Sequence, residues 1–228
     1  MSVFAIADLH LSFTVDKPMN IFGGWSDYTE RLETAWRKLV KDGDFVVLPG
    51  DISWAMDFAQ AKADFAFLQG LPGIKFVMKG NHDYWWNTAK KMNEFLTENG
   101  FLSVKIIHNS AEIADNIAVC GTRGWFYDLA DSADKKVLNR EVGRLRMSIE
   151  AAKKTGKEPV VFLHYPPLYG EYRCDEIMDT LLEYGIKRCY YGHLHAQSHK
   201  KAVTGLQEGI EFRLISADYL KFVPELVR

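Results

Sequence analysis

Five short polar motifs, each placed where an apolar run ends, constrain the fold of this 228-residue chain more than any other feature. The apolar runs are short and continuous, which is typical of buried strands, and helix-like segments alternate with them. This order predicts a sheet-rich α/β protein with helices on its outer faces. The motifs are Asp8-x-His10, Gly50-Asp51, Gly80-Asn81-His82-Asp83, His164 and Gly192-His193-x-His195. Because sites in open α/β sheets form at the carboxyl ends of strands, we expect the five motifs to lie together.

Periodicity and turn residues predict the elements between the motifs. Helices are expected over residues 27–41, 58–70, 85–99, 133–154 and 175–184. Strands are expected over 3–7, 45–48, 74–78, 104–107, 116–121, 159–163, 187–191, 201–204 and 210–216, the last two forming a hairpin around 205–209. Residues 11–25 and 122–131 are expected to be loops, and 218–228 indicate no element. Without a linker or a repeat, residues 1–228 are expected to form a single domain.

Two helix starts carry a capping-box pattern, in which an N-cap side chain and a residue three positions later satisfy each other's backbone amides. Asp27 with Glu30 predicts such a cap for the first helix, and Asp57 with Gln60 predicts one for the second.

Composition narrows the class of protein. Apolar residues make up 47% of the chain and charged residues 25%, so a sizeable core can form. The net charge of −2 argues against a protein that binds nucleic acid through a broad basic surface. Cys120, Cys174 and Cys189 are odd in number and widely spaced, which predicts reduced, buried thiols rather than disulfides or a zinc ribbon.

We expect a cytoplasmic protein without a membrane partner. The chain opens without a basic segment before its first apolar run, and no apolar stretch approaches the ~18 residues of a membrane span. The oligomeric state is not indicated by the sequence.

The residue types in the five motifs suit metal binding. On an extended strand residues i and i+2 point to one side, so Asp8 with His10, and His193 with His195, are each expected to reach one site together. A mixture of imidazoles with carboxylate and amide oxygens favours two ions of manganese, iron or zinc over magnesium or calcium. Taken singly, Asp8 and Asp51 could be caps or turn residues and His164 a buried core histidine. Their joint placement at successive strand ends favours a site.

The ordered motifs resemble the calcineurin-like metallophosphoesterase superfamily, whose pattern is Asp-x-His, Gly-Asp, Gly-Asn-His-Asp/Glu, a lone His and Gly-His-x-His. The resemblance runs from Val3 to about His195. It implies a four-layer α/β/β/α sandwich, with two central mixed sheets flanked by helices. It also implies two metal ions, one held by Asp8, His10, Asp51 and His195, and the other by Asp51, Asn81, His164 and His193.

The reaction implied by this resemblance is hydrolysis of a phosphoester by a metal-bridging hydroxide. His82 would then face the leaving oxygen as catalytic proton donor. The alternatives are a nuclease acting on DNA or RNA, or a non-catalytic metal-binding interaction module. The complete ligand set argues against the interaction module, and the acidic balance argues against the nuclease.

The residues expected to support His82 differ from those of the protein Ser/Thr phosphatase branch, which carries Gly-Asp-x-x-Asp-Arg and Gly-Asn-His-Glu. Residues 50–55 read Gly-Asp-Ile-Ser-Trp-Ala, so Trp54 stands where that branch has the aspartate partner of the histidine. Asp83 could orient His82 or cap the following helix, and Asp57 could substitute for the missing aspartate or only cap its own helix. We therefore do not expect a protein phosphatase of that branch.

The substrate is expected to be a small or nucleotide-like phosphomonoester or phosphodiester. His164-Tyr165-Pro166-Pro167 is similar to the His-His-Pro-Pro of bacterial cyclic-nucleotide phosphodiesterase-like members, with Tyr165 replacing a histidine. Arg123 is a candidate to clamp a phosphate. Aromatic side chains that could stack a base at the rim, or could pack in the core instead, are Tyr84, Trp85, Trp86, Trp125 and Tyr127.

Overall fold

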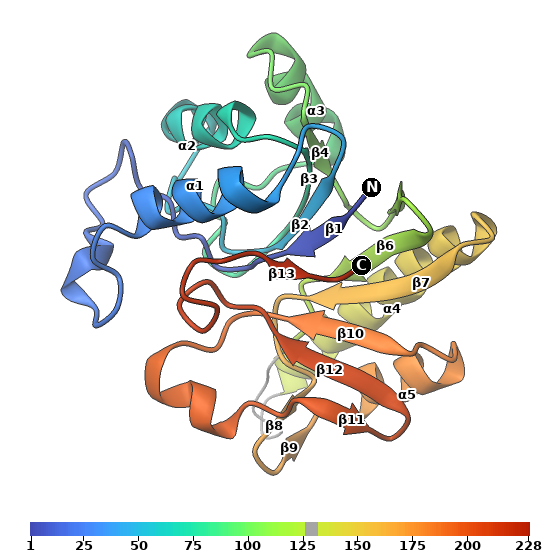
Figure 1. The fold of residues 1–228 in the computed structure, drawn as a ribbon. Coiled ribbons are helices and arrows are strands. Elements are labelled where there is room, and N and C mark those ends of the chain that lie inside the picture. Colours follow the sequence, from blue (N-terminus) through green and yellow to red (C-terminus); the bar gives the residue numbers. More distant parts are fainter. Residues whose placement is uncertain (126–131) are drawn as a thin grey trace.

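The computed structural model describes residues 1–125 and 132–228, which form two large β-sheets with helices outside them (Figure 1). The five-stranded sheet has the order β13 (Glu225–Leu226), β1 (Val3–Ala5), β2 (Phe45–Pro49), β3 (Ile74–Met78), β4 (Val104–Ile106). The six-stranded sheet has the order β11 (Gly205–Gln207), β12 (Ile210–Leu214), β10 (Arg188–Tyr191), β7 (Glu158–Leu163), β6 (Ile117–Thr122), β5 (Ala111–Ala114). A short hairpin joins β8 (Leu168–Tyr169) to β9 (Tyr172–Arg173).

Both large sheets are mixed. Strands β1 to β4 run parallel, with β13 antiparallel at the edge. Strands β6, β7, β10 and β12 also run parallel, with β5 and β11 antiparallel at the two edges. The carboxyl ends of the two parallel sets meet where Ala7 bridges to Ser216.

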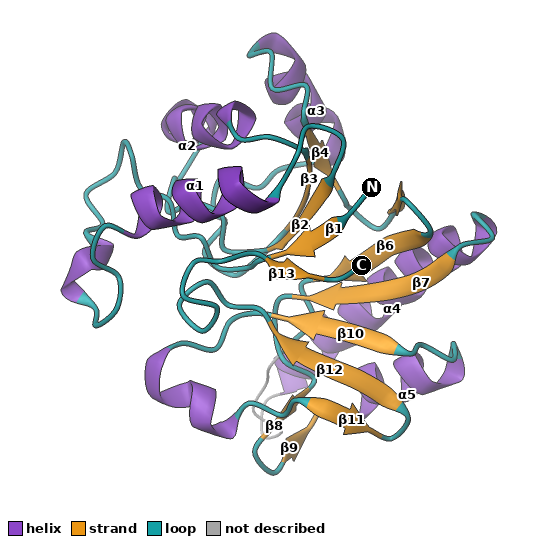
Figure 2. Cartoon of the chain, in the orientation of Figure 1, coloured by secondary structure: helices purple, strands orange, loops and turns teal. Residues whose placement is uncertain are grey.

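In the described part of the chain, α-helices cover the outer faces of both sheets (Figure 2). Helices α1 (Tyr28–Leu39), α2 (Phe58–Gly70) and α3 (Ala89–Glu98) cover the five-stranded sheet, and α4 (Ser132–Lys154) and α5 (Asp175–Glu183) cover the six-stranded sheet. Two short 3₁₀ helices span Met19–Ile21 and Ala196–Lys201. Among the described residues, no helix is both long and apolar enough to cross a membrane.

Alternation along the strands divides the core into three clusters, because successive side chains of a strand point to opposite faces. In β1, Phe4 packs in the cluster beneath α1 to α3, whereas Val3 packs in the cluster between the sheets. In β7, Val161 packs beneath α4 and α5, whereas Val160 joins Val3 between the sheets. Three clusters separate four layers, so the predicted α/β/β/α sandwich is confirmed. The three cysteines are free and buried, as predicted.

Three predicted elements are wrong in detail. Asp27 has a left-handed φ of 51° and its side chain makes no cap hydrogen bond, so the first capping box does not form. Helix α3 begins at Ala89, where the Thr88 hydroxyl accepts from the amide of Lys91, instead of at residue 85. The hairpin strand expected over 201–204 lies at Gly205–Gln207, and its turn is only Glu208–Gly209.

Several other segments differ from the prediction in extent. Strands β5 and β13 carry no pattern that the sequence analysis recognises. The loop expected over 122–131 begins after Thr122, the last residue of β6, and residues 126–131 lie outside the described residues. The single domain over 1–228 stays a prediction.

Candidate active site

All five sequence motifs follow parallel strands and meet at one edge of the sandwich. The amide of Asp8 donates to Gly50 O at 3.0 Å, and the amide of Gly192 donates to His164 O at 3.1 Å. These bonds tie the end of β1 to that of β2, and the end of β10 to that of β7. The motifs are thereby held together as predicted.

The backbone that presents the side chains is not extended. Asp8, His10, Asp51 and His193 have positive φ angles of 61°, 48°, 52° and 70°, a region that non-glycine residues rarely occupy. The i, i+2 argument from extended strands is therefore wrong in its geometry. Asp8 and His10 still reach one group of potential ligands, but His193 and His195 belong to two different groups.

The first group contains Asp8, His10 and His195, whose donor atoms all lie within 4.8 Å of one another. The Nε2 atoms of His10 and His195 are 3.3 Å apart, and His195 Nε2 is 3.7 Å from Asp8 Oδ1. The other Asp8 oxygen, Oδ2, accepts the amide of His193 at 2.8 Å. Asp8 Oδ1 therefore faces the histidines.

The second group contains Asp51, His164 and His193. His164 Nε2 is 2.6 Å from Asn81 Oδ1, which adds an amide oxygen to this group. The ring centroids of His164 and His193 are 5.1 Å apart.

Asp51 lies between the two groups. Its Oδ2 atom is 3.8 Å from His10 Nε2 and 3.6 Å from His164 Nε2. Its Oδ1 atom accepts the amide of His82 at 2.8 Å, which fixes the carboxylate. One carboxylate oxygen thus faces one histidine of each group.

Close backbone approach explains the glycines of two motifs. A Cβ on Gly80 would collide with Asp51 Oδ1, and one on Gly50 would lie 2.7 Å from Gly80 Cα. The small size of glycine, more than its freedom in φ, is what residue 80 requires.

His82 lies beside both groups and belongs to neither. Its ring contacts that of Trp54, with centroids 4.3 Å apart, and its Nδ1 is 3.3 Å from the Tyr84 hydroxyl. Burial, followed by the charge of His164, lowers the pKa of His82.

Asp83 neither orients His82 nor caps α3, so both predicted roles are wrong. Its buried carboxylate accepts the amides of Gly80 at 2.7 Å and of Asp51 and Ile52 at 2.9 Å each. These bonds join the turns after β2 and β3, which carry Asp51 and Asn81. Burial and the charge of Asp51 raise the pKa of Asp83 to about 7.

Asp57 only caps its own helix. Its carboxylate accepts the amide of Gln60 at 2.9 Å, at the start of α2. The partner of His82 is thus the Tyr84 hydroxyl.

The sequence analysis missed Asp218, which follows β12. Its Oδ1 is 2.9 Å from His195 Nδ1, and its Oδ2 accepts the amide of Ala196 at 3.1 Å. Asp218 thereby orients one ring of the first group. The available signal was its place after an apolar strand, like that of the five motifs.

The rim candidates are divided between surface and core. Tyr84 is 52% exposed, whereas Trp85 is buried. Trp86 and Trp125 are half-buried, and Tyr127 lies outside the described residues. Arg123 lies over the ring of Trp125 at 4.8 Å, and its backbone oxygen accepts the amide of Tyr165 at 2.8 Å.

Protonation in the two groups follows from burial and from close charges. Burial lowers the pKa of His10 to about 3 and that of His193 to about 4, which leaves both rings neutral at pH 7. Burial acts to lower the pKa of His195, but the hydrogen bond to Asp218 and the nearby charge of Asp8 outweigh it and raise the pKa to about 10.

The two carboxyl groups shift in opposite directions. Burial and the charge of Asp8 raise the pKa of Asp51 to about 8. Burial acts to raise the pKa of Asp8 too, but the charge of the nearby His195 holds it below its usual range. Two buried carboxylates this close both ionise readily only when cations compensate them.

The residues present fit bound metal ions. Asp8 Oδ1 and His10 Nδ1 are buried without a hydrogen-bond partner among the described residues. Donor atoms 3.3–3.8 Å apart suit ligands that each lie ~2.0–2.2 Å from a shared ion. The donor set of imidazoles and carboxylates favours a transition metal.

A sandwich that gathers two adjacent histidine–aspartate groups at its strand ends is that of a metallohydrolase. The chain belongs to the calcineurin-like phosphoesterase family, whose model matches residues 1–197. It is a metal-dependent hydrolase that acts on phosphoric ester bonds.

Solved structures share the fold at low identity. Phosphopantetheinyl hydrolase (PptH) from Mycobacterium tuberculosis is 14% identical with a TM-score of 0.57, covering 99% of this chain and 95% of that one. AQ665 from Aquifex aeolicus, a protein of unknown function, is 13% identical with a TM-score of 0.51 and the same coverage. TT1561 from Thermus thermophilus is 11% identical with a TM-score of 0.55, covering 92% of this chain and 86% of that one. No curated protein matched the sequence.

Proposed function

We propose that the chain is a dinuclear metal-dependent phosphohydrolase that cleaves a phosphomonoester or phosphodiester of a small or nucleotide-like molecule. The observation that carries the proposal is the position of Asp51 Oδ2, 3.8 Å from His10 Nε2 and 3.6 Å from His164 Nε2. A carboxylate oxygen that faces both groups is suited to bridge two ions.

The ligand roles follow the two groups. Asp8, His10, Asp51 and His195 would hold one ion, and Asp51, Asn81, His164 and His193 would hold the other. Manganese, iron and zinc suit this donor set. When bound, two such ions supply Lewis acidity that activates a water nucleophile and neutralises the phosphoryl oxygens.

His82 would hold the proton that the leaving oxygen needs. The backbone amide of His82 donates a hydrogen bond to the Asp51 carboxylate, which fixes the residue beside the two groups. Its Nδ1 faces the Tyr84 hydroxyl. Nε2 is therefore the atom left to donate toward a substrate. Proton transfer of this kind contributes ~10²–10⁴-fold to turnover.

The size of the substrate stays a prediction from the sequence, and the surroundings of the two groups support a role for Arg123. The ring of Tyr165 packs against that of His193, with centroids 4.5 Å apart. The backbone oxygen of Arg123 accepts a hydrogen bond from the amide of Tyr165. The proposed substrate-binding role of Arg123 rests on this placement. A cytoplasmic location and the absence of nucleic-acid partners stay predictions.

The test is an activity screen on the manganese-loaded protein, with p-nitrophenyl phosphate as monoester and bis-p-nitrophenyl phosphate as diester. We expect hydrolysis of at least one, and His82→Ala should lower kcat by ~10²–10⁴-fold with unchanged metal content. Loss of metal from His82→Ala, or a variant as active as the wild type, would contradict the assignment of His82. Inactivity of the loaded wild type toward both compounds would contradict the proposed function.

A further inference from the structure

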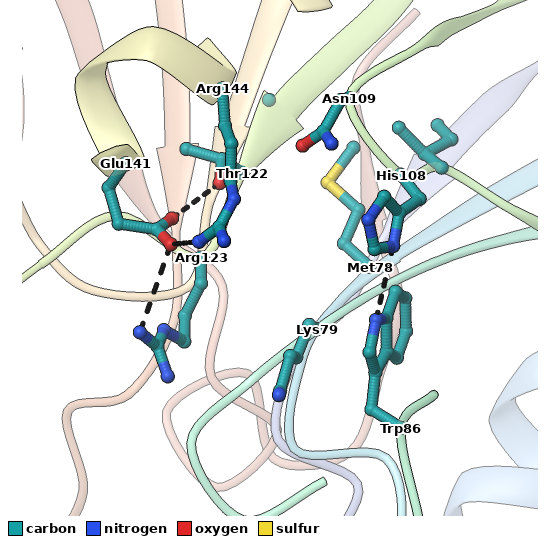
Figure 3. Close-up of a pocket in the computed structure, with 11 residues that line it drawn as sticks. Met78, Lys79, Trp86, His108, Asn109, Thr122, Arg123, Glu141 and Arg144 are labelled. Atoms are coloured by element: carbon teal, nitrogen blue, oxygen red, sulfur yellow. Dashed lines mark hydrogen bonds and ion pairs between the residues drawn. The ribbon is translucent and has the colours of Figure 1, made fainter. Parts of the chain in front are cut away.

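A cavity of about 130 Å³ lies next to the proposed metal ligands, between the end of β3 and helix α4 (Figure 3). One water needs ~10–15 Å³, so the cavity can take a group of several heavy atoms. Figure 3 shows Glu141, Arg123 and Arg144 on one side and Trp86 and His108 on the other. Lys79 lies between the two sides.

The lining carries a positive charge. Lys79, Arg123 and Arg144 provide three cations, and Glu141 provides one carboxylate, so 3 − 1 leaves a net charge of +2. Burial, followed by the charge of Arg144, lowers the pKa of His108, which keeps its ring neutral at pH 7. A dianion such as a phosphate would balance this charge.

Glu141 organises the two guanidinium groups. Its carboxylate is only 2% exposed and accepts a hydrogen bond from the Thr122 hydroxyl at 2.7 Å. The same carboxylate forms an ion pair with Arg144 and lies 3.8 Å from the Arg123 guanidinium. The Arg144 side chain remains 44% exposed and Arg123 20%, so both groups keep access to the cavity. Arg123 Nε is buried without a hydrogen-bond partner among the described residues.

The opposite wall adds a neutral donor. The Trp86 indole N–H can only donate, and it is 3.3 Å from His108 Nδ1. His108 Nδ1 is therefore the acceptor, and the neutral ring carries its proton on Nε2. The lining thus offers cationic side chains together with the neutral N–H donor at His108 Nε2. Groups of these kinds recognise a phosphate.

The residues that line the cavity lie close in the chain to those of the proposed active site. Lys79 is two residues before Asn81, so their Cα atoms are at most ~7 Å apart. Arg123 O accepts the amide of Tyr165, the residue after His164. Two lining residues of the cavity are thus tied closely to segments that carry proposed ligands.

We propose that this cavity binds a second phosphate of the substrate, so that the enzyme prefers a small molecule with two phosphate groups, one hydrolysed and one anchored by Lys79, Arg123 and Arg144. The proposal rests on the proposed function for the hydrolysed phosphate. The anchoring itself depends only on the cavity.

The first test measures anchoring without hydrolysis. Inorganic phosphate is titrated into metal-free protein, so that no bound metal ion competes with the cavity for the anion. Arg144→Gln and Lys79→Gln should each weaken binding by about tenfold, because each removes a charge-assisted hydrogen bond. Arg140→Gln, an exposed arginine of the same helix outside the cavity, is the matched control and should bind like the wild type. Equal binding by all four proteins, or no binding by the wild type, would overturn the proposal.

The second test measures substrate preference in the manganese-loaded enzyme. The pairs are glucose 1,6-bisphosphate with glucose 6-phosphate, and adenosine 3′,5′-bisphosphate with adenosine 5′-phosphate. The ratio of kcat/KM within a pair should favour the bisphosphate in the wild type and in Arg140→Gln, and should fall about tenfold in Arg144→Gln and Lys79→Gln. Unchanged ratios would overturn the proposal even if phosphate binds, since the cavity would then serve a free anion. A wild type inactive on every phosphoester would instead contradict the proposed function, whatever the binding result.

Discussion

The indole ring of Trp54 lies against the imidazole of His82, with ring centroids 4.3 Å apart. Trp54 also stacks on His10, at 5.0 Å and an interplanar angle of 23°. One side chain therefore packs on a proposed metal ligand and on the proposed proton donor. In the protein Ser/Thr phosphatase pattern, from which the chain departs here, an aspartate at this place partners the histidine. Here an uncharged ring positions His82, and the Tyr84 hydroxyl is its hydrogen-bonding neighbour.

Tyr84→Phe removes the hydroxyl that lies 3.3 Å from His82 Nδ1. Because Tyr84 is 52% exposed, water competes for this bond, and we expect kcat to fall only ~2–10-fold with metal content unchanged. Steady-state kinetics on the screened substrate measures the effect. Tyr184→Phe, whose hydroxyl bonds Glu150 on the outer helices, is the control and should match the wild type. An unchanged kcat for Tyr84→Phe would show that the hydroxyl does not position His82.

Asp218→Asn tests whether Asp218 orients His195. The carboxylate, 2.9 Å from His195 Nδ1, holds a proton on that nitrogen and leaves Nε2 free to bind a metal ion. Changing such a partner typically lowers metal affinity by ~10–100-fold, and we expect that loss for one of the two ions. Competition with a chelator measures it. Asp175→Asn, at an exposed position, is the control and should bind metal with wild-type affinity. Wild-type metal affinity in Asp218→Asn would refute the orienting role.

Asp83→Ala should destabilise the protein strongly. It leaves the amides of Gly80, Asp51 and Ile52 without their buried acceptor, at a cost of ~1–3 kcal/mol for each unsatisfied group. We expect the free energy of unfolding to fall by ~3 kcal/mol or more in urea titrations. Asp57→Ala, which removes one exposed helix cap, should cost ~1 kcal/mol. A smaller loss for Asp83→Ala than for Asp57→Ala would contradict the structural role of Asp83.

The strand-end motifs could be predicted because each is local: a continuous apolar run fixes the strand, and the next residues carry the chemistry. The roles of Asp83 and Asp218 could not be predicted in this way. Asp83 bonds the amide of Asp51, 32 residues away, and Asp218 contacts His195, 23 residues away. Strand β13 was missed for a similar reason, since its two residues are a strand only through pairing with β1.

The start of α3 was misplaced because Trp85 continues the apolar pattern of the helix. The structure buries Trp85 in a loop, edge-on against Phe65 at 4.9 Å, with its indole N–H donating to Asp83 at 3.1 Å. Tertiary packing, and not helix periodicity, accounts for this apolar residue. The gathering of the motif residues in one place was nevertheless predictable, although the positive φ angles that present Asp8 and His193 were not.

Lys75 should make stability depend on pH. Its Nζ is buried and donates to Leu71 O and to the Ser103 hydroxyl, and burial lowers the pKa of Lys75 to about 8. An unfolded lysine has a pKa of ~10.4, so between pH 8 and ~10.4 the unfolded chain holds a proton that the folded chain has lost. The free energy of unfolding therefore rises with pH in this window.

The measurement compares wild type with Lys75→Met in urea at pH 7.5, 9 and 10. Relative to Lys75→Met, the free energy of unfolding of the wild type should rise by up to ~3 kcal/mol as the pH rises above ~8. Below pH ~8 the difference between the two proteins should be constant. A difference that does not change with pH would mean that Lys75 titrates normally.

Metal stoichiometry tests the central claim most directly. The purified protein, loaded with manganese and freed of excess ion, should hold two ions per chain by elemental analysis. His195→Ala, which removes a proposed ligand of the first ion, should hold about one, because the second group, with His164 and His193, remains intact. Fewer than two ions per chain in the fully loaded wild type would contradict the dinuclear site.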